Sequence, residues 1–434
     1  ARRIGFFAAC CTLLLPMFQA SALLMTIDGP YAACWAVACW LGHRAIVRGQ
    51  PWMWSAAALA VGIGVLFKYT ALILPLSWLI AFAASRSLRR RTPFRPLPIL
   101  SAIVVFAACL LPIAIWNARE GWPTIAHLLG HLGMKGGDVI ASPTADPWRY
   151  RPQWTLFYIV GQFALAGPVF ALALVGALRA RHTLTRSGVV RVSCFLTLLV
   201  FYFVVSFITE TEGNWAFAAH VAGCVLAAGV IESGMSTWKA RVLAWRRLAK
   251  PRPREGFLFA RPASVVQILW HSSLIMGVIA AVGIVVLPVI DTAWKAITGA
   301  ARSPIPVGRF TNADRMGDHA AALAWELERT TGQRPFYCAL HYGRAAQLAF
   351  YVPGRPTVVC ASSMIAGGRQ TQYDWWPETR PDHPSLRGRP AVVVGGTRSD
   401  WMPWFRSVGD PVTLNGDGKR GRPAFQAIDF YPPD

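Results

Sequence analysis

Nine long apolar segments, separated by short polar or basic stretches, constrain the fold of this chain more than any other feature. A helix needs about 20 apolar residues to cross the hydrocarbon core of a bilayer. Two of the segments are short for a full span, so tilt or partial burial is expected there. We predict a multi-pass α-helical membrane protein whose segments are Ile4 to Ile27, Pro30 to Val47, Met53 to Phe67, Thr70 to Ala84, Leu97 to Trp116, Trp154 to Leu178, Val189 to Ile208, Trp215 to Ile231 and Val265 to Ile290.

The composition agrees with a lipid environment. Of the 434 residues, 54% are hydrophobic and only 15% are charged, which is too little polar surface for a soluble protein of this size. The net charge of +22 would suit nucleic acid, but the basic residues stand in short runs between the apolar segments. Such runs are typical of cytoplasmic loops. The sequence therefore predicts membrane lipid, and no nucleic acid, as a partner.

Charge also predicts the orientation in the membrane. If every segment crosses, all the basic runs fall on one side, which is then the cytoplasm. These runs are Arg2-Arg3, His43 to Arg48, Arg86 to Arg95, Arg179 to Arg191 and Lys239 to Arg261. The outer side then receives Asp28, Lys68, the loop from Asn117 to Gln153, the ETEGNW loop from Glu210 to Trp215, and everything after Ile290.

The chain changes character after Ile290, where it becomes rich in Arg, Asp, Gly and Pro. Helical spacing is present in Gly317 to Gly332, and the segments PFYCAL, PTVVCA and PAVVVGG predict strands, with a helix in RAAQLAFYV between the first two. We predict two domains: a transmembrane domain over residues 1–290 and an extracytoplasmic α/β domain with a partly parallel sheet over residues 291–434.

Cysteines do not form a metal or disulfide pattern. Seven of the nine lie in apolar segments, where free thiols behave as small hydrophobic side chains. Cys338 and Cys360 each close a predicted strand. A disulfide between them and two separately buried thiols both fit the sequence, and the second arrangement is the more common one on neighbouring strands.

Lys68 lies between two apolar runs in GVLFKYTALILP. A cation within the bilayer core costs about 2.5 to 3.5 kcal/mol on insertion scales unless it is paired or reaches the headgroups. One interpretation is structural, with the side chain extending to the outer headgroups. The other is functional: the ammonium group would bind the phosphate of a lipid-linked substrate.

Acidic side chains are predicted near Lys68. Asp28 precedes Pro30 in MTIDGP, so it could act as a helix cap or as part of a site at the same membrane face. The loop ETEGNW places two carboxylates and an amide in a few residues, which is either a short polar turn or part of that site.

His127 and His131 are four residues apart in IAHLLGHLG, a spacing that would suit a metal ion on one helix face. The sequence shows no third ligand beside them, so an interfacial helix with two polar residues is the plainer interpretation. We therefore assign no metal ligands. A divalent cation is compatible with the sequence but is not required by it, and the cofactors stay unknown.

Six motifs occur in an order and spacing that resemble the bacterial family 39 type of membrane glycosyltransferases. These enzymes are relatives of dolichyl-phosphate-mannose protein mannosyltransferases and of the aminoarabinose transferase that acts on lipid A, and they have a GT-C-like fold. The motifs are distributed over most of the length of the chain, from Met25 to Pro377. They are MTIDGP, GIGVLFKYTALILP, IWNAREGWPTIAHL, ETEGNWAFAAH, AAQLAFYVPGRP and QYDWWP.

The resemblance implies an enzyme of the bacterial inner membrane. It would take a sugar from a polyprenyl-phosphate carrier at the outer face and transfer it, with inversion, to a hydroxyl of a lipid, glycan or protein. Lys68 with Tyr69 would bind the donor phosphate, and Asp28 would be an acidic catalytic position that orients substrate or an ion. The further candidates for substrate binding are Glu210, Glu212, Asn214, Trp215 and His127.

Two departures from the family pattern matter. Relatives often have proline where this chain has Ile27 before the aspartate. The family's general base comes from an acidic pair in the first outer loop, and the chain opens at Ala1-Arg2-Arg3 after that region. We therefore expect that about two spans and the catalytic base precede this sequence.

Two other classes of function remain open at this stage. A transporter or flippase of lipid-linked sugars would place ionisable groups near the membrane midplane on broken helices within repeated halves. The acids here gather at one predicted surface and no repeat is visible, which favours the enzyme. A non-catalytic membrane anchor would tolerate replacement of Lys68 and Asp28.

Overall fold

The structure is a computed structural model. It describes residues 2–24, 26–131, 134–139, 149–183, 185–248, 265–299, 313–365, 367–414 and 422–431, and for residues 181 and 236–248 it describes the backbone only. The chain divides into two compact units. Unit 1 comprises Ala1–Gly121 and Arg149–Ile284, and unit 2 comprises Trp122–Trp148 and Val285–Asp434. Residues 122–148, which we expected in the transmembrane domain, therefore group with the C-terminal unit.

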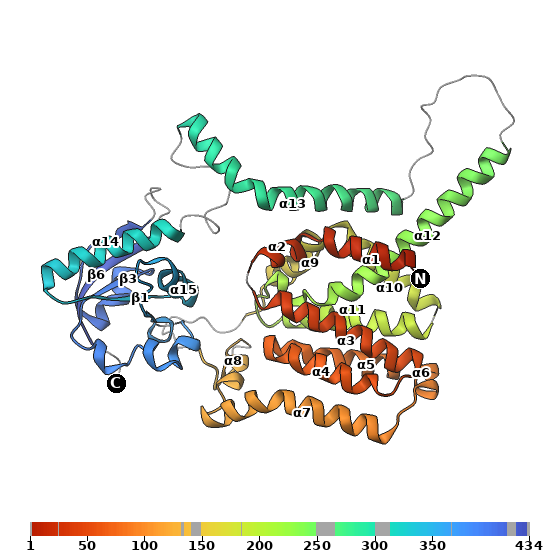
Figure 1. Cartoon of the computed structure of the whole chain (residues 1–434), viewed down its shortest axis with the longest axis horizontal. Coiled ribbons are helices and arrows are strands. Elements are labelled where there is room, and N and C mark those ends of the chain that lie inside the picture. The colour runs from red at the N-terminus through yellow and green to blue at the C-terminus, as the bar shows by residue number, and fades with distance from the viewer. Residues whose placement is uncertain are drawn as a thin grey trace. The chain divides into compact units, whose positions relative to one another are not determined.

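Unit 1 is built from helices (Figure 1). Its first half contains α1 (Arg2–Leu14), α2 (Pro16–Leu23), α3 (Asp28–Arg48), α4 (Met53–Phe67), the 3-10 helix η1 (Tyr69–Leu72), α5 (Ile73–Ala84), α6 (Arg86–Arg91) and α7 (Pro96–Arg119). Its second half contains α9 (Pro152–Ala166), α10 (Pro168–Thr183), α11 (Arg186–Val205), the 3-10 helix η2 (Gly213–Ala216), α12 (Ala219–Leu248) and most of α13 (Val265–Thr298).

Each predicted apolar segment is helical over most of its length, but two of them are sharply bent between two helices. Among the described residues, three helices are long and apolar enough to cross a membrane, or up to five if each of two bent pairs counts as one span. The expected single helix from Ile4 to Ile27 breaks before Pro16 with a 64° bend, and that from Trp154 to Leu178 breaks at Gly167 with a 104° bend.

Proline explains both breaks. It lacks an amide donor and its ring clashes with the carbonyl four residues earlier, so it favours the first turn of a new helix. Pro16 opens α2, and Pro168 opens α10 directly after Gly167, whose φ of 57° ends α9. Because apolar residues continue on both sides of each proline, the hydrophobic pattern predicts one continuous segment and does not show the change of direction.

The described side chains of unit 1 form a continuous hydrophobic core, which contains buried aromatic residues such as Trp35, Tyr31, Phe195 and Phe217. Close helix approach depends on glycine: a Cβ at Gly42 of α3 would lie 2.4 Å from the ring of Trp78 in α5. A side chain at this position would push the two helices apart.

Unit 2 is an α/β domain, and its described residues form a six-stranded sheet of order β2-β1-β3-β6-β4, with β5 paired to β6. The strands β1, β2 and β3 are parallel, and β6 is antiparallel to β3, β4 and β5. The elements are α8 (Pro123–His131), α14 (Ala313–Thr331), β1 (Phe336–Ala339), α15 (Tyr342–Tyr351), β2 (Val358–Cys360), β3 (Ala391–Val394), α16 (Arg398–Trp401), β4 (Phe405–Val408), β5 (Val412–Leu414) and β6 (Arg422–Phe430).

The predicted helices and strands of this domain are therefore confirmed, including the partly parallel sheet. Side chains alternate across the strands and form a core on each face: Ala339, Val392 and Val394 pack with α14 and α15, and Phe336 and Val393 pack on the other side. Cys338 and Cys360 are buried free thiols and form no disulfide.

Candidate functional site

Asp28 and Lys68 form an ion pair in unit 1. Lys68 Nζ lies 2.9 Å from Asp28 Oδ1, with 17% of the lysine side chain and 7% of the aspartate side chain exposed. The cost of placing a lysine between apolar runs is thus offset by a carboxylate, and the ammonium group does not depend on the headgroups alone. The pair joins the first residue of α3 to the residue that follows α4.

Local backbone structure explains why Lys68 can reach this partner. Helix α4 ends at Phe67, and Lys68 adopts an extended conformation (φ −155°, ψ 122°) before η1 begins at Tyr69. Its amide still donates to the carbonyl of Gly64, at 2.9 Å. The break between α4 and η1 therefore places Lys68 at the junction of two helical elements, while its side chain is free to leave the helix surface.

The second oxygen of Asp28 is also engaged. Asn214 Nδ2 donates to Asp28 Oδ2, at 2.7 Å, although 186 residues separate the two in sequence. The N-cap position of α3 belongs to Ile27, so Asp28 is the first helical residue and not the cap. Since Oδ1 accepts from Lys68 and Oδ2 from Asn214, the carboxylate connects two segments of the bundle.

The ETEGNW loop is held in place by contacts at its C-terminal end. Gln162 Nε2 donates to the carbonyl of Gly213, at 3.1 Å. The Oε1 atom of the same glutamine lies 3.0 Å from His220 Nε2. Trp215 packs against Tyr202 with ring centroids 5.4 Å apart. These contacts fix the turn from which Asn214 reaches Asp28, so the loop is more than a short polar connection.

Two groups beside Lys68 were missed in the sequence analysis. Lys68 Nζ lies 5.7 Å from the ring centroid of Tyr31, within the range of a cation–π contact, and Thr70 Oγ1 donates to Tyr31 Oη at 3.1 Å. The spacing of Asp28 and Tyr31, three residues apart on one helix, could have indicated that the tyrosine faces the same side.

We call Asp28, Lys68 and Asn214 the Asp28 cluster. The other predicted site residues lie outside this group of three side chains. Tyr69 opens η1 next to Lys68 and is 36% exposed. Glu210 and Glu212 lie in the same loop as Asn214, but both side chains are exposed and form no ion pair with another described residue. The structure thus brings together three of the predicted residues.

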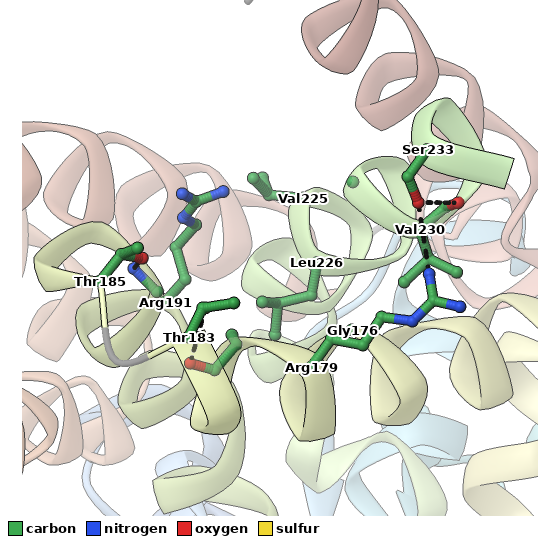
Figure 2. A pocket seen from close by; sticks show the side chains of 12 residues that line it. Gly176, Arg179, Thr183, Thr185, Arg191, Val225, Leu226, Val230 and Ser233 are labelled. Carbon is green, nitrogen blue, oxygen red and sulfur yellow. Dashed lines mark hydrogen bonds between the residues drawn. The ribbon is translucent and has the colours of Figure 1, made fainter. Parts of the chain in front are cut away.

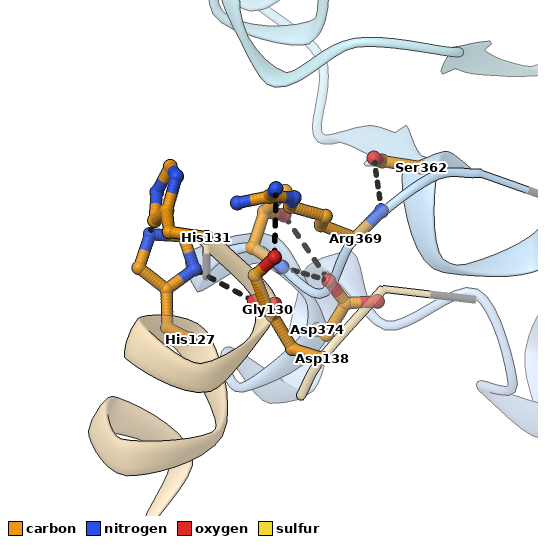
Figure 3. Close-up of polar contacts among 8 residues, drawn as sticks. His127, Gly130, His131, Asp138, Ser362, Arg369 and Asp374 are labelled. Carbon is orange, nitrogen blue, oxygen red and sulfur yellow. Dashed lines mark hydrogen bonds and ion pairs between the residues drawn. The ribbon is translucent and has the colours of Figure 1, made fainter. Parts of the chain in front are cut away.

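His127 belongs to unit 2, where it forms a separate polar cluster (Figure 3). His127 Nδ1 lies 2.6 Å from Asp138 Oδ2, and its Nε2 lies 3.1 Å from His131 Nε2. Arg369 donates through Nη2 to the carbonyl of Gly130, at 3.4 Å. The backbone of Arg369 also forms an isolated antiparallel β-bridge with Val139. These contacts attach residues 122–139 to the α/β domain.

Burial and nearby positive charge keep the His131 side chain of this second cluster neutral at pH 7. Burial, with the positive charge of Arg369 and the neighbouring His127, lowers the pKa of His131 to about 4. Within the described residues, no group of three His, Cys, Asp or Glu side chains is arranged to hold a metal ion. Asp138 contacts Nδ1 of His127, whereas His131 contacts Nε2 on the other side of the same ring. The carboxylate and His131 therefore meet His127 at different atoms.

The Asp28 cluster is suited to binding a phosphate. An ammonium group carries three N–H donors, and Asp28 accepts one of them, so Lys68 can hold a second anionic oxygen without leaving its partner. Asp28, which itself accepts a hydrogen bond from Asn214, fixes the position of the lysine in a partly dry environment, where such a contact is stronger than in bulk water.

Comparison with known proteins agrees with this fold. Residues 1–116 match the model of the dolichyl-phosphate-mannose-protein mannosyltransferase family. The crystal structure of ArnT from Cupriavidus metallidurans bound to undecaprenyl phosphate matches with a TM-score of 0.53 and 16% sequence identity, over 98% of this chain and 79% of that one. The apo form of the same protein matches with a TM-score of 0.51 and 16% identity, over 98% and 78% of the two chains. No curated protein sequence matches the chain.

The chain is therefore a multi-pass helical membrane protein with a GT-C fold and a C-terminal α/β domain, as the sequence predicted. The resemblance to the protein mannosyltransferase family is confirmed over residues 1–116, which include both Asp28 and Lys68.

Proposed function

We propose that the chain is an inverting glycosyltransferase, which moves a sugar from a polyprenyl-phosphate carrier to a hydroxyl group of an acceptor at the outer face of a bacterial inner membrane. One observation carries the proposal: within a GT-C fold, the largely buried Lys68 pairs with Asp28, whose second oxygen accepts a hydrogen bond from Asn214. A cation held in this way supports the binding of a lipid-linked phosphate. ArnT, which shares the fold, has been crystallised with undecaprenyl phosphate, a carrier of this chemical class.

In the proposed reaction, the bond between the anomeric carbon and the carrier phosphate breaks, and the acceptor oxygen forms the new glycosidic bond from the opposite face. The bond electrons remain on the carrier phosphate, and the proton of the acceptor hydroxyl passes to a general base. Lys68 stabilises the negative charge that develops on the departing phosphate. Because this charge grows during the reaction, the contact accelerates the step as well as binding the donor.

Asp28 has a positioning role in this scheme. Both of its oxygens already accept hydrogen bonds, from Lys68 and from Asn214, so it is poorly placed to take the acceptor proton. We assign it to holding the lysine, and we assign the proton transfer to a different residue. Tyr69 remains a candidate for binding the donor phosphate, and Glu210, Glu212 and Trp215 remain candidates for contacts with the substrates.

The transfer assay uses membranes of cells that produce the whole natural protein, together with a radiolabelled polyprenyl-phosphate sugar. We expect Lys68→Ala to lower the rate of transfer by about 100-fold, the effect of losing one donor to a developing negative charge. Lys295→Ala is the matched control, because Lys295 also pairs with an aspartate (Asp291, at 3.2 Å) but lies in α13. A transporter would move the labelled lipid without cleaving it, so release of free carrier phosphate separates the two functions.

Binding is measured separately with unlabelled undecaprenyl phosphate and purified protein. Lys68→Ala should weaken this binding, whereas Lys68→Arg should retain part of it because the charge remains. The proposal fails if Lys68→Ala and Lys295→Ala behave alike in both assays. It also fails if label crosses the membrane while the carrier–sugar bond stays intact.

A further inference from the structure

A pocket of about 200 Å³ lies between α10, α11 and α12, within unit 1 (Figure 2). Figure 2 shows Arg191 on one side and Arg179 on the other, with Leu226 between them. Val225 and Val230 add apolar surface to the lining, and Ser233 and two threonines add hydroxyl groups. The pocket thus combines two cations with an apolar wall.

No carboxylate of the described residues neutralises these two arginines. Arg179 Nη1 donates to Ser233 Oγ, at 3.3 Å, and Arg191 donates through Nε and Nη2 to the carbonyl and hydroxyl oxygens of Ser187, at 3.1 and 2.7 Å. All of these acceptors are neutral, and each guanidinium has five N–H donors. Two like charges at one pocket favour an anion from outside, and a phosphate fits the planar donor geometry of arginine.

The position of the pocket indicates where this anion comes from. Its arginines belong to the basic run from Arg179 to Arg191, which the charge distribution predicts at the cytoplasmic surface. A free phosphate ion would gain nothing from the apolar wall formed by Val225, Leu226 and Val230. A phospholipid carries both parts, because its phosphate lies at the membrane surface and its acyl chains extend into the apolar region.

We propose that this pocket binds the phosphate of an anionic phospholipid, held by Arg179 and Arg191. The site is separate from the Asp28 cluster and does not depend on the function proposed for it. It would fix this end of α10, α11 and α12 to lipids of the inner leaflet. Basic pockets between membrane helices are a general means of recognising phospholipid headgroups.

Gly229 provides a test that leaves both charges in place. It lines the pocket, and a Cβ built there meets no heavy atom within 4 Å. Gly229→Leu therefore extends into the open pocket without a backbone clash, and leucine favours the helix more than glycine does. Arg179→Gln removes one of the two cations. Arg90→Gln is the matched control, because Arg90 is exposed on α6 and does not line the pocket.

The assay measures binding of dioleoyl phosphatidylglycerol to the purified full chain in phosphatidylcholine nanodiscs, by native mass spectrometry and by the rise in unfolding temperature. We expect Arg179→Gln to weaken binding by about tenfold, corresponding to the loss of one charge-assisted contact. Gly229→Leu should weaken it by a similar factor, because the leucine side chain occupies space that the lipid needs. Arg90→Gln should bind nearly as the wild type does. Unfolding temperatures in phosphatidylcholine alone show whether each variant is folded.

Two results would overturn the proposal. If Arg90→Gln loses as much affinity as Arg179→Gln while Gly229→Leu loses none, the lipid is attracted by general surface charge and not by the pocket. If inorganic phosphate at the same concentration raises the unfolding temperature as much as phosphatidylglycerol does, the site takes a soluble anion.

Discussion

Replacing only one partner of the Asp28–Lys68 pair should destabilise the bundle strongly. At 2.9 Å and an effective dielectric constant of about 20, the attraction between the two charges is about 6 kcal/mol, most of which offsets their desolvation. Removing one partner leaves the other charge with 17% or less of its side chain exposed. We therefore expect Asp28→Asn and Lys68→Met each to lower the free energy of unfolding by about 3 kcal/mol.

The double variant distinguishes an ion pair from two independent effects. When both charges are removed, neither remains unpaired, so the loss should be clearly smaller than the sum of the single losses. We expect a coupling free energy of about 2 kcal/mol from this double-mutant cycle. The assay is denaturant unfolding of the purified protein in detergent, followed by the fluorescence of its tryptophans.

The pair Lys295–Asp291 provides the control cycle. Its two residues are one turn apart on α13, and 32% of the lysine side chain is exposed, so its coupling should be only about 0.3 to 0.5 kcal/mol. The reasoning is refuted if the losses from Asp28→Asn and Lys68→Met add to within about 0.5 kcal/mol, because independent sites behave in that way.

Three further predictions concern packing, protonation and thiol reactivity. Gly42→Val should cost about 1 to 3 kcal/mol in denaturant unfolding, because its Cβ would lie 2.4 Å from the ring of Trp78; no change would mean that the helices can separate freely. The lowered pKa of His131 contributes stability that is complete above pH 6.5 and is lost as the pH falls towards 4, so His131→Gln should flatten the decline of unfolding temperature over that range. Burial raises the pKa values of Cys338 and Cys360, so both should resist maleimide until the domain unfolds; rapid labelling of the folded protein would contradict this.

Much of the secondary structure was readable from the sequence because its signals are local. Long apolar runs predict helices, and short apolar runs rich in valine, such as the one that contains Val392 and Val393, predict buried strands. The C-terminal strands β4 to β6 were missed. Exposed residues interrupt these strands, as in Phe405–Val408, where only the first and last residues are buried, so the strands give a weaker hydrophobic signal than those that are buried throughout.

Candidate site residues were only partly predictable. The cost of a lysine in an apolar region pointed to Lys68, and the predicted orientation grouped it with Asp28. The role of Tyr31 could not be deduced in this way, since a tyrosine in an apolar helix carries no such cost. The spacing of the two histidines also could not predict that His127 belongs to the α/β unit or that it contacts Asp138.

The sequence by itself determined that this is a membrane protein of helical segments with a mixed α/β domain, because hydrophobicity and side-chain periodicity act over a few neighbouring residues. Only the tertiary structure decided that α9 and α10 meet at 104° and that Asn214 donates to a carboxylate 186 residues away. Such contacts depend on how helices pack, and packing is decided by the shapes of side chains that are distant in sequence. The chemistry proposed for Lys68 rests on that packing.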